Sequence, residues 1–502
     1  MREPNPDTYQ DDGKVNSQHN IGYKHPHSPH LNYERRHGNN DTASYRSDAA
    51  ANETADITAN ETDTDTNTDT HTVRRIANNL LPRASKYPTN KLLSERLSGV
   101  FWGWWVVAAG MGLQMLVAGL MMQAYGAYVP VLQESFGWSK TTLSTVFSVQ
   151  RLQSGIAAPF QGWLLERFGS KRVVGVGVII FASGFWGLST INSLSGFVVM
   201  FLWLGLGATF TGFLSVTTTV VNWFERRRAS ALSLVSVGMS IGGLLVPTIA
   251  WLLATQGWRF TARFSSIAIL IIGLPLSRLM RSRPEAYGMQ PDGDPVQGNQ
   301  TREPEGVSAS TALRSRSFWF ISIGHASAVT VVSAVSVHTV SHLSEGLGYS
   351  LPRAASVIAI MTSMSLVGQL LGGYLGDTFN KRAIATGAMA AHASAILLLA
   401  YAANFVWVLG FAVLHGLAWG MRGPLMGALR ADYFGRRAFG KIMGYSIPVV
   451  TMGMMGGPIV AGYFADVTGS YKTGFTALAG VALIGSLFFV FAGRPLVANQ
   501  KT

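Results

Sequence analysis

The sequence has 502 residues, of which 48% are hydrophobic and only 13% are charged. Soluble globular proteins carry about 25% charged residues, so this composition excludes an ordinary soluble domain, and the 55 glycines are typical of helices packed in lipid. The absence of cysteine excludes disulfides and thiol chemistry. The net charge of +13 is explained below by membrane topology, so no nucleic-acid partner is expected.

Residues 1–98 differ in composition from the rest of the chain. The stretch Asn52–Thr72 consists largely of Thr, Asp, Asn and Glu, which leaves too few apolar residues to offset the entropy cost of folding. No charged-apolar-cleavage pattern opens the chain, so no cleaved signal peptide is expected. We therefore predict a disordered cytoplasmic tail over 1–98.

Twelve later segments have the roughly 20 apolar residues that a membrane-spanning helix needs. They lie near 101–131, 141–165, 173–190, 196–222, 229–254, 260–280, 317–343, 351–375, 383–402, 405–431, 440–465 and 474–493. With an even number of spans, twenty of the 27 Lys and Arg residues from residue 99 on lie beside one face of the membrane and five beside the other. The positive-inside rule then places both termini in the cytoplasm. The polar stretch 281–316 is predicted to be a cytoplasmic linker, and 495–502 a short tail.

Four short segments recur with a period near 210 residues. They are GWLLERFGSKR (162–172) with GYLGDTFNKR (373–382), WFERR (223–227) with YFGRR (433–437), FGWS (136–139) with LGYS (347–350), and GWR (257–259) with SYK (470–472). Such a repeat in an apolar chain predicts two homologous bundles related by an axis along the bilayer normal, with substrate bound between them. The predicted fold class is an all-α membrane protein with twelve transmembrane helices in two pseudo-symmetric six-helix bundles, 99–280 and 317–494.

The segment GWLLERFGSKR resembles the loop 2–3 signature of the major facilitator superfamily, and its second copy falls in loop 8–9. The resemblance covers about 99–494. The segments 103–107, 136–139, 223–228 and 433–440 are similar to the branch of monocarboxylate porters and oxalate/formate exchangers. This resemblance implies small carboxylate substrates. However, the helix 1 lysine and the helix 8 acidic-basic pair of animal monocarboxylate carriers are missing, as is the helix 4 arginine common in proton-coupled drug exporters.

Two arginines lie well inside predicted spans, Arg151 and Arg422. A helix-centre arginine costs about 2.5–3.5 kcal/mol on the insertion scale, so each is a functional candidate. His415 and Trp419 share a helix face with Arg422, and the resemblance implies that this helix, the tenth, lines the cavity. A guanidinium can hold a carboxylate by two parallel hydrogen bonds, while an aromatic ring encloses its apolar part. The alternatives are that Arg422 binds backbone carbonyls near the gate and that Arg151 braces helix 11.

Tyr125 and Thr211 are further candidate ligands, although hydrogen bonds between helices would explain them equally well. No carboxylate lies at the centre of a predicted span. Candidates for proton coupling are therefore His415, His325 and His338, because the unperturbed pKa of histidine is about 6.5; the substrate's own carboxyl is another. No metal or other cofactor is expected, because no acid or cysteine accompanies the histidines at 338 and 342.

The duplicated loop is predicted to act in conformational gating. Gly162 and Gly373 allow close packing, and Glu166 and Asp377 could pair with arginines or cap a facing helix. Basic residues of the loop would also lie beside anionic headgroups. The resemblance implies that such contacts hold the cytoplasmic side shut until the halves rock. The gating set is Gly162, Glu166, Arg167, Gly169, Lys171, Arg172, Gly373, Asp377, Lys381 and Arg382.

Three functions fit these features. The first is a secondary active transporter of small organic anions, above all monocarboxylates, acting by alternating access as a monomer in the plasma membrane, with proton coupling open. The second is an exporter of apolar compounds or drugs with the same fold, and the third a non-transporting receptor or scaffold. An enzyme is not expected, because the sequence contains no metal cluster, nucleotide loop or paired catalytic carboxylates. We favour the first.

Overall fold

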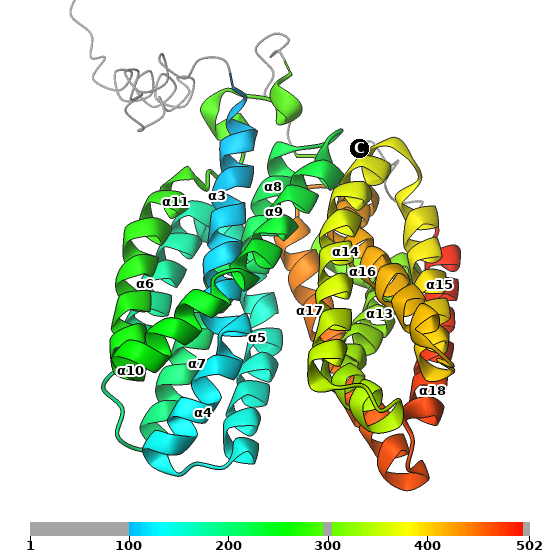
Figure 1. Ribbon diagram of the computed structural model, residues 1–502. Coiled ribbons are helices and arrows are strands. Elements are labelled where there is room, and N and C mark those ends of the chain that lie inside the picture. Colours follow the sequence, from blue (N-terminus) through cyan, green and yellow to red (C-terminus); the bar gives the residue numbers. More distant parts are fainter. Residues whose placement is uncertain (1–99, 295–303, 495–502) are drawn as a thin grey trace, which may run out of the picture. The chain divides into compact units, whose positions relative to one another are not determined.

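The structure, a computed structural model, describes residues 100–294 and 304–494. The tails predicted for 1–98 and 495–502 lie outside these residues. The described part consists of helices, and in Figure 1 they form two groups that lie side by side, one running from α3 to α11 and the other from α13 to α18. The two groups correspond to the two predicted bundles.

Three spans of the first group are interrupted, and the sixth passes through the π-helical turn η2 (Ile269–Gly273). The first span passes from α3 through a π-helical turn into α4, and the fourth is broken at Gly212 between α7 and α8. The helices are α3 (Trp102–Val117), η1 (Ala118–Gln123), α4 (Tyr125–Phe136), α5 (Lys140–Phe168), α6 (Ser170–Leu188), α7 (Leu194–Thr211), α8 (Phe213–Trp223), α9 (Arg228–Gly243), α10 (Val246–Ala268), η2 (Ile269–Gly273) and α11 (Leu274–Leu279).

The second group follows a connection that itself contains short helices. These are η3 (Glu285–Tyr287), η4 (Pro291–Gly293) and α12 (Ala309–Arg314). The spans of the second group are α13 (Arg316–Ser341) with η5 (His342–Gly346), α14 (Leu351–Thr378), α15 (Lys381–Ala400), α16 (Phe405–Phe434), α17 (Phe439–Thr468) and α18 (Tyr471–Phe491).

Ten helical stretches of the described chain are long and apolar enough to cross a membrane. One of them, Arg228–Leu279, has 52 residues and contains Gly257 with φ 78° and ψ 166°, so two spans meet at this turn. The helix α5 is not among the ten, because it is rich in Ser, Thr and Gln, yet with 29 residues it runs the length of the first group. Counting both gives the twelve predicted spans, so the predicted fold class is confirmed.

Polar side chains fix where several helices begin. Ser139, in one copy of a repeated motif, accepts a hydrogen bond from the backbone N–H of Thr142 at the start of α5. Ser470, in another, accepts one from Lys472 at the start of α18. Asn380 caps α15 in the same way. Such caps satisfy backbone donors that have no partner within the helix, and each contributes about 1 kcal/mol.

The two halves pack closely at the end of the bundle that carries most of the basic loops, which we call the basic end (loops 167–172, 223–228, 379–382 and 434–441). A side-chain carbon on Gly162 of α5 would overlap the carbonyl oxygen of Gly440, just inside α17. One on Gly373 of α14 would lie 2.8 Å from the Cβ of Ser233 in α9. Only glycine permits both approaches.

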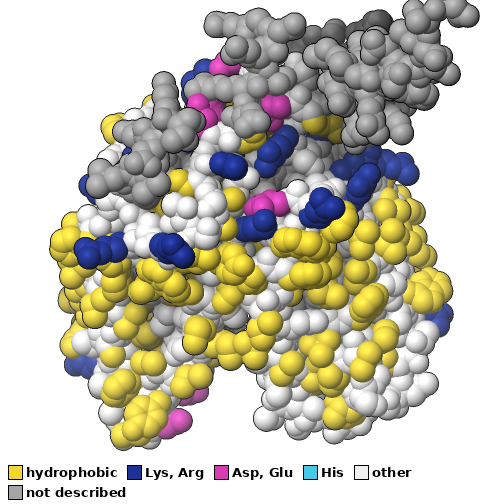
Figure 2. Space-filling model, turned by 180° about the vertical axis from the view of Figure 1, so that it is seen from behind, with side chains coloured by type: hydrophobic (Ala, Val, Ile, Leu, Met, Phe, Trp, Pro, Cys, Tyr) yellow, Lys and Arg dark blue, Asp and Glu magenta, His cyan; other side chains and the backbone are white. Residues whose placement is uncertain are grey.

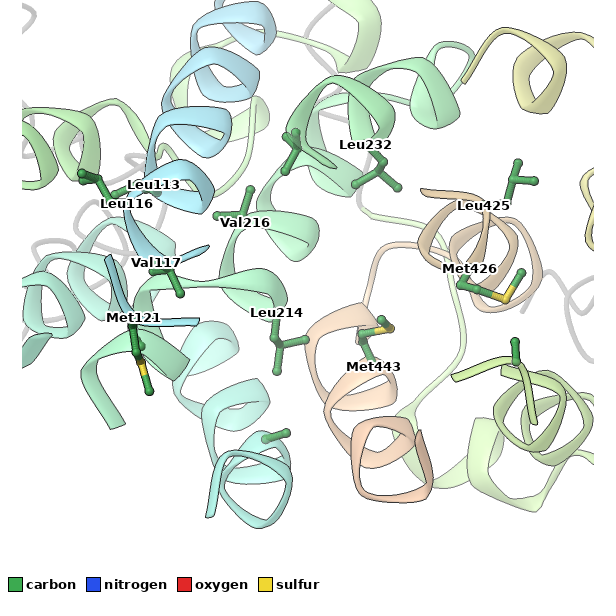
Figure 3. Packing of buried hydrophobic residues seen from close by; sticks show 14 of the residues in the cluster. Leu113, Leu116, Val117, Met121, Leu214, Val216, Leu232, Leu425, Met426 and Met443 are labelled. Carbon is green, nitrogen blue, oxygen red and sulfur yellow. The ribbon is translucent and has the colours of Figure 1, made fainter. Parts of the chain in front are cut away.

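Apolar side chains complete the contact between the halves. Figure 3 shows Leu214 of α8 and Met443 of α17 pointing toward one another across the boundary. Leu232 of α9 and Leu425 of α16 lie farther along the same boundary, and both are buried. These side chains exclude water from the basic end of the interface.

The halves separate at the opposite end. Figure 2 shows a notch between two lobes there, away from most of the Lys and Arg side chains. A pocket of about 470 Å³ opens between α5 and α17 and is lined by Thr141, Ser144, Thr145, Ser148, Val149, Leu152 and Met455. The structure is thus closed at the basic end and open at the other.

Gly162→Ala and Gly373→Ala should each lower the thermal unfolding temperature of the detergent-solubilised protein. Each added methyl group forces two helices apart, and such overpacking costs about 1–3 kcal/mol. Gly456→Ala in α17 is the matched control, because a side-chain carbon there would meet nothing within 4 Å. Equal unfolding temperatures for all three variants would contradict the close packing described above.

Candidate functional site

A buried cation occupies the middle of α16. The side chain of Arg422 is only 3% exposed, and its Nε and Nη1 atoms have no hydrogen-bond partner among the described residues. These two donors therefore make none of the backbone carbonyl contacts expected under the alternative reading. The neighbouring Gly423 has open space on its side-chain face. A buried guanidinium whose donors have no partner is expected to bind an anion strongly.

Two histidines contact each other near this arginine, and the one on α16 lies two helical turns from it. The Nδ1 atoms of His415 on α16 and His392 on α15 lie 3.2 Å apart, with the ring centroids at 4.7 Å. Both side chains are fully buried, and both Nε2 atoms have no partner among the described residues. His392 was not predicted, although an ionisable residue in the otherwise apolar segment 383–402 is a signal that could have identified it.

A second buried arginine lies two turns beyond Arg422. Arg430 donates from Nη1 to the carbonyl oxygen of Met426 at 3.1 Å, and its Nη2 lies 3.4 Å from Nδ1 of His325 on α13. Arg430 lies at the end of the predicted span 405–431; α16 continues to Phe434, and the Arg430 side chain is 0% exposed.

These five residues form the arginine–histidine cluster (His325, His392, His415, Arg422 and Arg430). The charge of Arg422 acts on both rings of the histidine pair, and His325 lies within reach of both arginines. Trp419, one turn from Arg422 on α16, is partly buried against the apolar core. Of the residues predicted to bind substrate, His415, Trp419 and Arg422 are thus brought together.

The other predicted ligands lie in the first half. Arg151 on α5 lies over the ring of Phe147 at 5.0 Å, and Phe147 stacks on Tyr125 with centroids 4.6 Å apart. The hydroxyl of Tyr125 donates to the carbonyl oxygen of Leu143 at 2.7 Å. Thr211 is buried at the end of α7, and its hydroxyl faces Gly177 of α6. The described contacts of these residues lie within the first half.

The residues predicted to couple protons also lie in two different places. His325 and His415 belong to the arginine–histidine cluster. His338 lies thirteen residues from His325 on α13, about 20 Å along the helix axis. Its Nε2 is 3.0 Å from the carbonyl oxygen of Pro458 on α17, and its ring packs against Tyr471. No group of three or more metal-ligating side chains was found among the described residues.

The two acids of the duplicated loop each cap a helix of the other half. Glu166 accepts a hydrogen bond from the backbone N–H of Lys441 at 3.2 Å and pairs with its Nζ at 2.8 Å, at the start of α17. Asp377 accepts hydrogen bonds from the backbone N–H groups of Ala229 and Ser230 at 2.8 and 3.0 Å, at the start of α9. The negative charges also complement the positive ends of these helix dipoles.

Two buried arginines add ion pairs across the same boundary. Nη1 of Arg228 lies 2.6 Å from Oδ1 of Asp432, whose other oxygen contacts Lys381 at 2.8 Å. Arg436 contacts Glu225 at 2.9 Å and donates to the carbonyl oxygen of Asn222, also at 2.9 Å. The sequence analysis identified the repeated motif that contains Arg436 but gave it only a topological role.

The remaining basic residues of the predicted gating set make different contacts. Arg167, Lys171 and Arg172 are exposed, and Arg382 donates to the carbonyl oxygen of Ala492 at 3.3 Å within the second half. Gly169 has φ 79°, a conformation that favours glycine, and it allows the sharp turn from α5 into α6.

The connection between the halves is attached to both of them. On the first half, Asp292 accepts hydrogen bonds from the backbone N–H groups of Glu225 and Arg226, and Asp294 pairs with Arg226 at 2.6 Å. On the second half, Val307 donates to the carbonyl oxygen of Phe434 at 3.0 Å. The predicted linker therefore forms part of the closed basic end.

Comparisons with known proteins agree with this architecture. Residues 111–382 and 339–502 match the Major Facilitator Superfamily. Monocarboxylate transporter 11 from Homo sapiens is 26% identical over 409 residues, which cover 78% of this chain and 83% of that protein.

Two solved structures share the fold. The human organic anion transporter MFSD10 superposes with a TM-score of 0.61 at 15% identity, covering 77% of this chain and 99% of that one. The proton:xylose symporter XylE superposes with a TM-score of 0.62 at 16% identity, covering 78% of this chain and 96% of that one. The chain is a multi-pass membrane protein that belongs to the Major Facilitator Superfamily and acts as a secondary transporter of small molecules, not as an enzyme.

Proposed function

We propose that this transporter carries small organic anions, above all monocarboxylates, and that Arg422 binds the carboxylate. The observation that carries the proposal is the buried guanidinium with two free donors. An unpaired charge in a low-dielectric interior is costly, and a bound anion supplies the missing partner. Trp419, one turn away, offers an apolar surface for the rest of the molecule.

Several features support this substrate class. Arg430 adds a second buried cation, and the described part of α16 carries no carboxylate before Asp432 to neutralise the pair. A relative, Monocarboxylate transporter 11, is named for the same class of anion. An exporter of apolar compounds, the second candidate, would gain nothing from the charge of Arg422.

We further propose that the protein works by alternating access as a monomer in the plasma membrane, with both termini in the cytoplasm. In this orientation the basic end is cytoplasmic, and the notch in Figure 2 opens to the outside. The halves 99–280 and 317–494 rock about the bound anion, while 281–316 connects them. Inward opening then requires Glu166 and Asp377 to release α17 and α9.

Arg422→Gln should raise the KM for anion uptake at least tenfold. A hydrogen bond to a charged group contributes about 1.5–3 kcal/mol, and this variant removes the charge. Arg422→Lys keeps the charge but loses the paired geometry, so a smaller increase is expected. The measurement is uptake of radiolabelled acetate, pyruvate, lactate and succinate into proteoliposomes.

The control for this experiment is Arg314→Gln, which changes an exposed arginine on α12. Unchanged anion uptake by Arg422→Gln, or no saturable uptake of any of the four anions by the wild type, would contradict the proposal. Uptake by a chain lacking residues 1–90 separates transport from the receptor or scaffold alternative, because a transporter should retain its flux.

Asp377→Asn should increase the fraction of molecules that are open at the basic end. Losing the charged cap costs the closed state about 1 kcal/mol, which changes the ratio of open to closed molecules about fivefold. Because the chain has no cysteine, a single Thr217→Cys substitution reports on this end by its rate of maleimide labelling. Thr217 is buried beside Gly427 of the other half.

The labelling rate of Thr217→Cys should rise when Asp377→Asn is added. Lys171→Gln, which changes an exposed side chain of the first copy of the loop, should leave the labelling rate unchanged if that residue only faces lipid headgroups. A labelling rate that is insensitive to Asp377→Asn would show that the cap does not hold this end shut.

A further inference from the structure

We propose that the His392–His415 pair is the proton-binding site that couples anion transport to protons. This inference rests on the proposed function and extends it, because it names the coupling ion and a residue, His392, that the sequence analysis did not consider. Three observations carry it: the contact between the rings, their complete burial, and the two Nε2 atoms without partners.

The hydrogen-bonding capacity of the two imidazole rings determines how many protons the pair can bind. A neutral imidazole has one N–H donor and one acceptor nitrogen. When the two Nδ1 atoms share a single hydrogen, the ring that donates it has a bare Nε2, and the ring that accepts it carries its own hydrogen on Nε2. The pair therefore offers one vacant basic nitrogen in a buried position. Adding one proton to that nitrogen makes the pair a single cation.

The surrounding charges link this proton to the anion. Arg422 lies seven residues from His415, about 10 Å along α16, so the two side chains share one face of this helix. A proton on the pair would add a positive charge to a cluster that already contains Arg422 and Arg430. An anion bound to Arg422 cancels this repulsion, so proton and anion favour each other's binding, and the coupling is reciprocal.

Other ionisable groups lie on the helices that pack against the pair. His325 on α13 contacts Arg430, His338 on α13 contacts the carbonyl oxygen of Pro458, and His342 on η5 contacts the carbonyl oxygen of Leu399 on α15. The helix α14 has ionisable side chains only toward its ends, at Arg353, Tyr374 and Asp377, and α18 has them only at its start, at Tyr471 and Lys472. The His392–His415 pair differs from these histidines because both of its Nε2 atoms are buried without a partner among the described residues.

The test compares two kinds of flux in proteoliposomes that contain purified full-length protein. The probe is whichever of acetate, pyruvate, lactate or succinate the wild type carries fastest. Net uptake is driven by an inward gradient of one pH unit, and exchange is measured at equal pH on both sides with unlabelled anion inside. Exchange returns each proton with each anion, so it does not require the pair to release its proton.

For the wild type, one-to-one symport of a proton with a monovalent anion should give up to about tenfold accumulation from one pH unit, because that gradient is a tenfold concentration ratio. His392→Gln should retain exchange and lose the accumulation, and His415→Gln should likewise lose the accumulation. His338→Gln is the matched control: its ring binds the carbonyl oxygen of Pro458, far from Arg422, and accumulation should persist. Protein-free liposomes correct for anions that cross as the undissociated acid.

Wild-type exchange without any effect of the pH gradient would overturn the proton site and leave the proposed anion function intact. Absence of all anion flux would instead overturn the proposed function. Accumulation that survives in both histidine variants would show that the proton travels elsewhere, for example on the substrate. If both variants fail to fold, the wild type still tests coupling: adding anion must consume external protons with a stoichiometry near one, and no proton consumption would overturn the proposal.

Discussion

The closed state depends on two helices that begin at the boundary between the halves. The first backbone N–H groups of α9 and α17 have no partner within their own helix, and a membrane interior offers little water to satisfy them. Each set is satisfied by a carboxylate from the opposite half, Asp377 or Glu166. Glycines one turn before these acids allow the helices to approach closely enough for the contact. Separation of the halves at this end must expose both sets of donors, so the caps and the packing are lost together.

Charges at this boundary and in the arginine–histidine cluster are arranged differently. At the boundary, Arg228 and Arg436 are buried but paired with Asp432 and Glu225. Breaking either pair leaves a buried arginine uncompensated. In the cluster, Arg422 and Arg430 have no carboxylate partner among the described contacts. The ion pairs at the boundary stabilise the closed conformation. The arginines of the cluster, in contrast, have a negative partner only when an anion binds.

The fold could be predicted from the sequence because apolar segments and short motifs recur along it at regular spacing. Apolar lengths, the 210-residue repeat and the basic loops determine the number of spans, their pairing into halves and the location of the glycines and acids. The side chains that meet across helices were harder to predict. Spacing on one helix shows that His415 and Arg422 share a face, but it does not show that His392 of α15 lies opposite. Likewise, Thr211 is polar and central in sequence, yet its hydroxyl faces Gly177 within its own half.

The attachment of the connecting segment has a consequence for how the polypeptide could be built. Asp292 and Asp294 bind the first half and Val307 binds the second, while Glu285 also pairs with Arg436 of the second half at 2.8 Å. A chain break between Asp294 and Pro304 would cut no described hydrogen bond. Two separately synthesised polypeptides would retain the reciprocal caps, the ion pairs and the apolar contacts that join them. These non-covalent contacts hold the halves together alongside the covalent connection, as the interface of a dimer does.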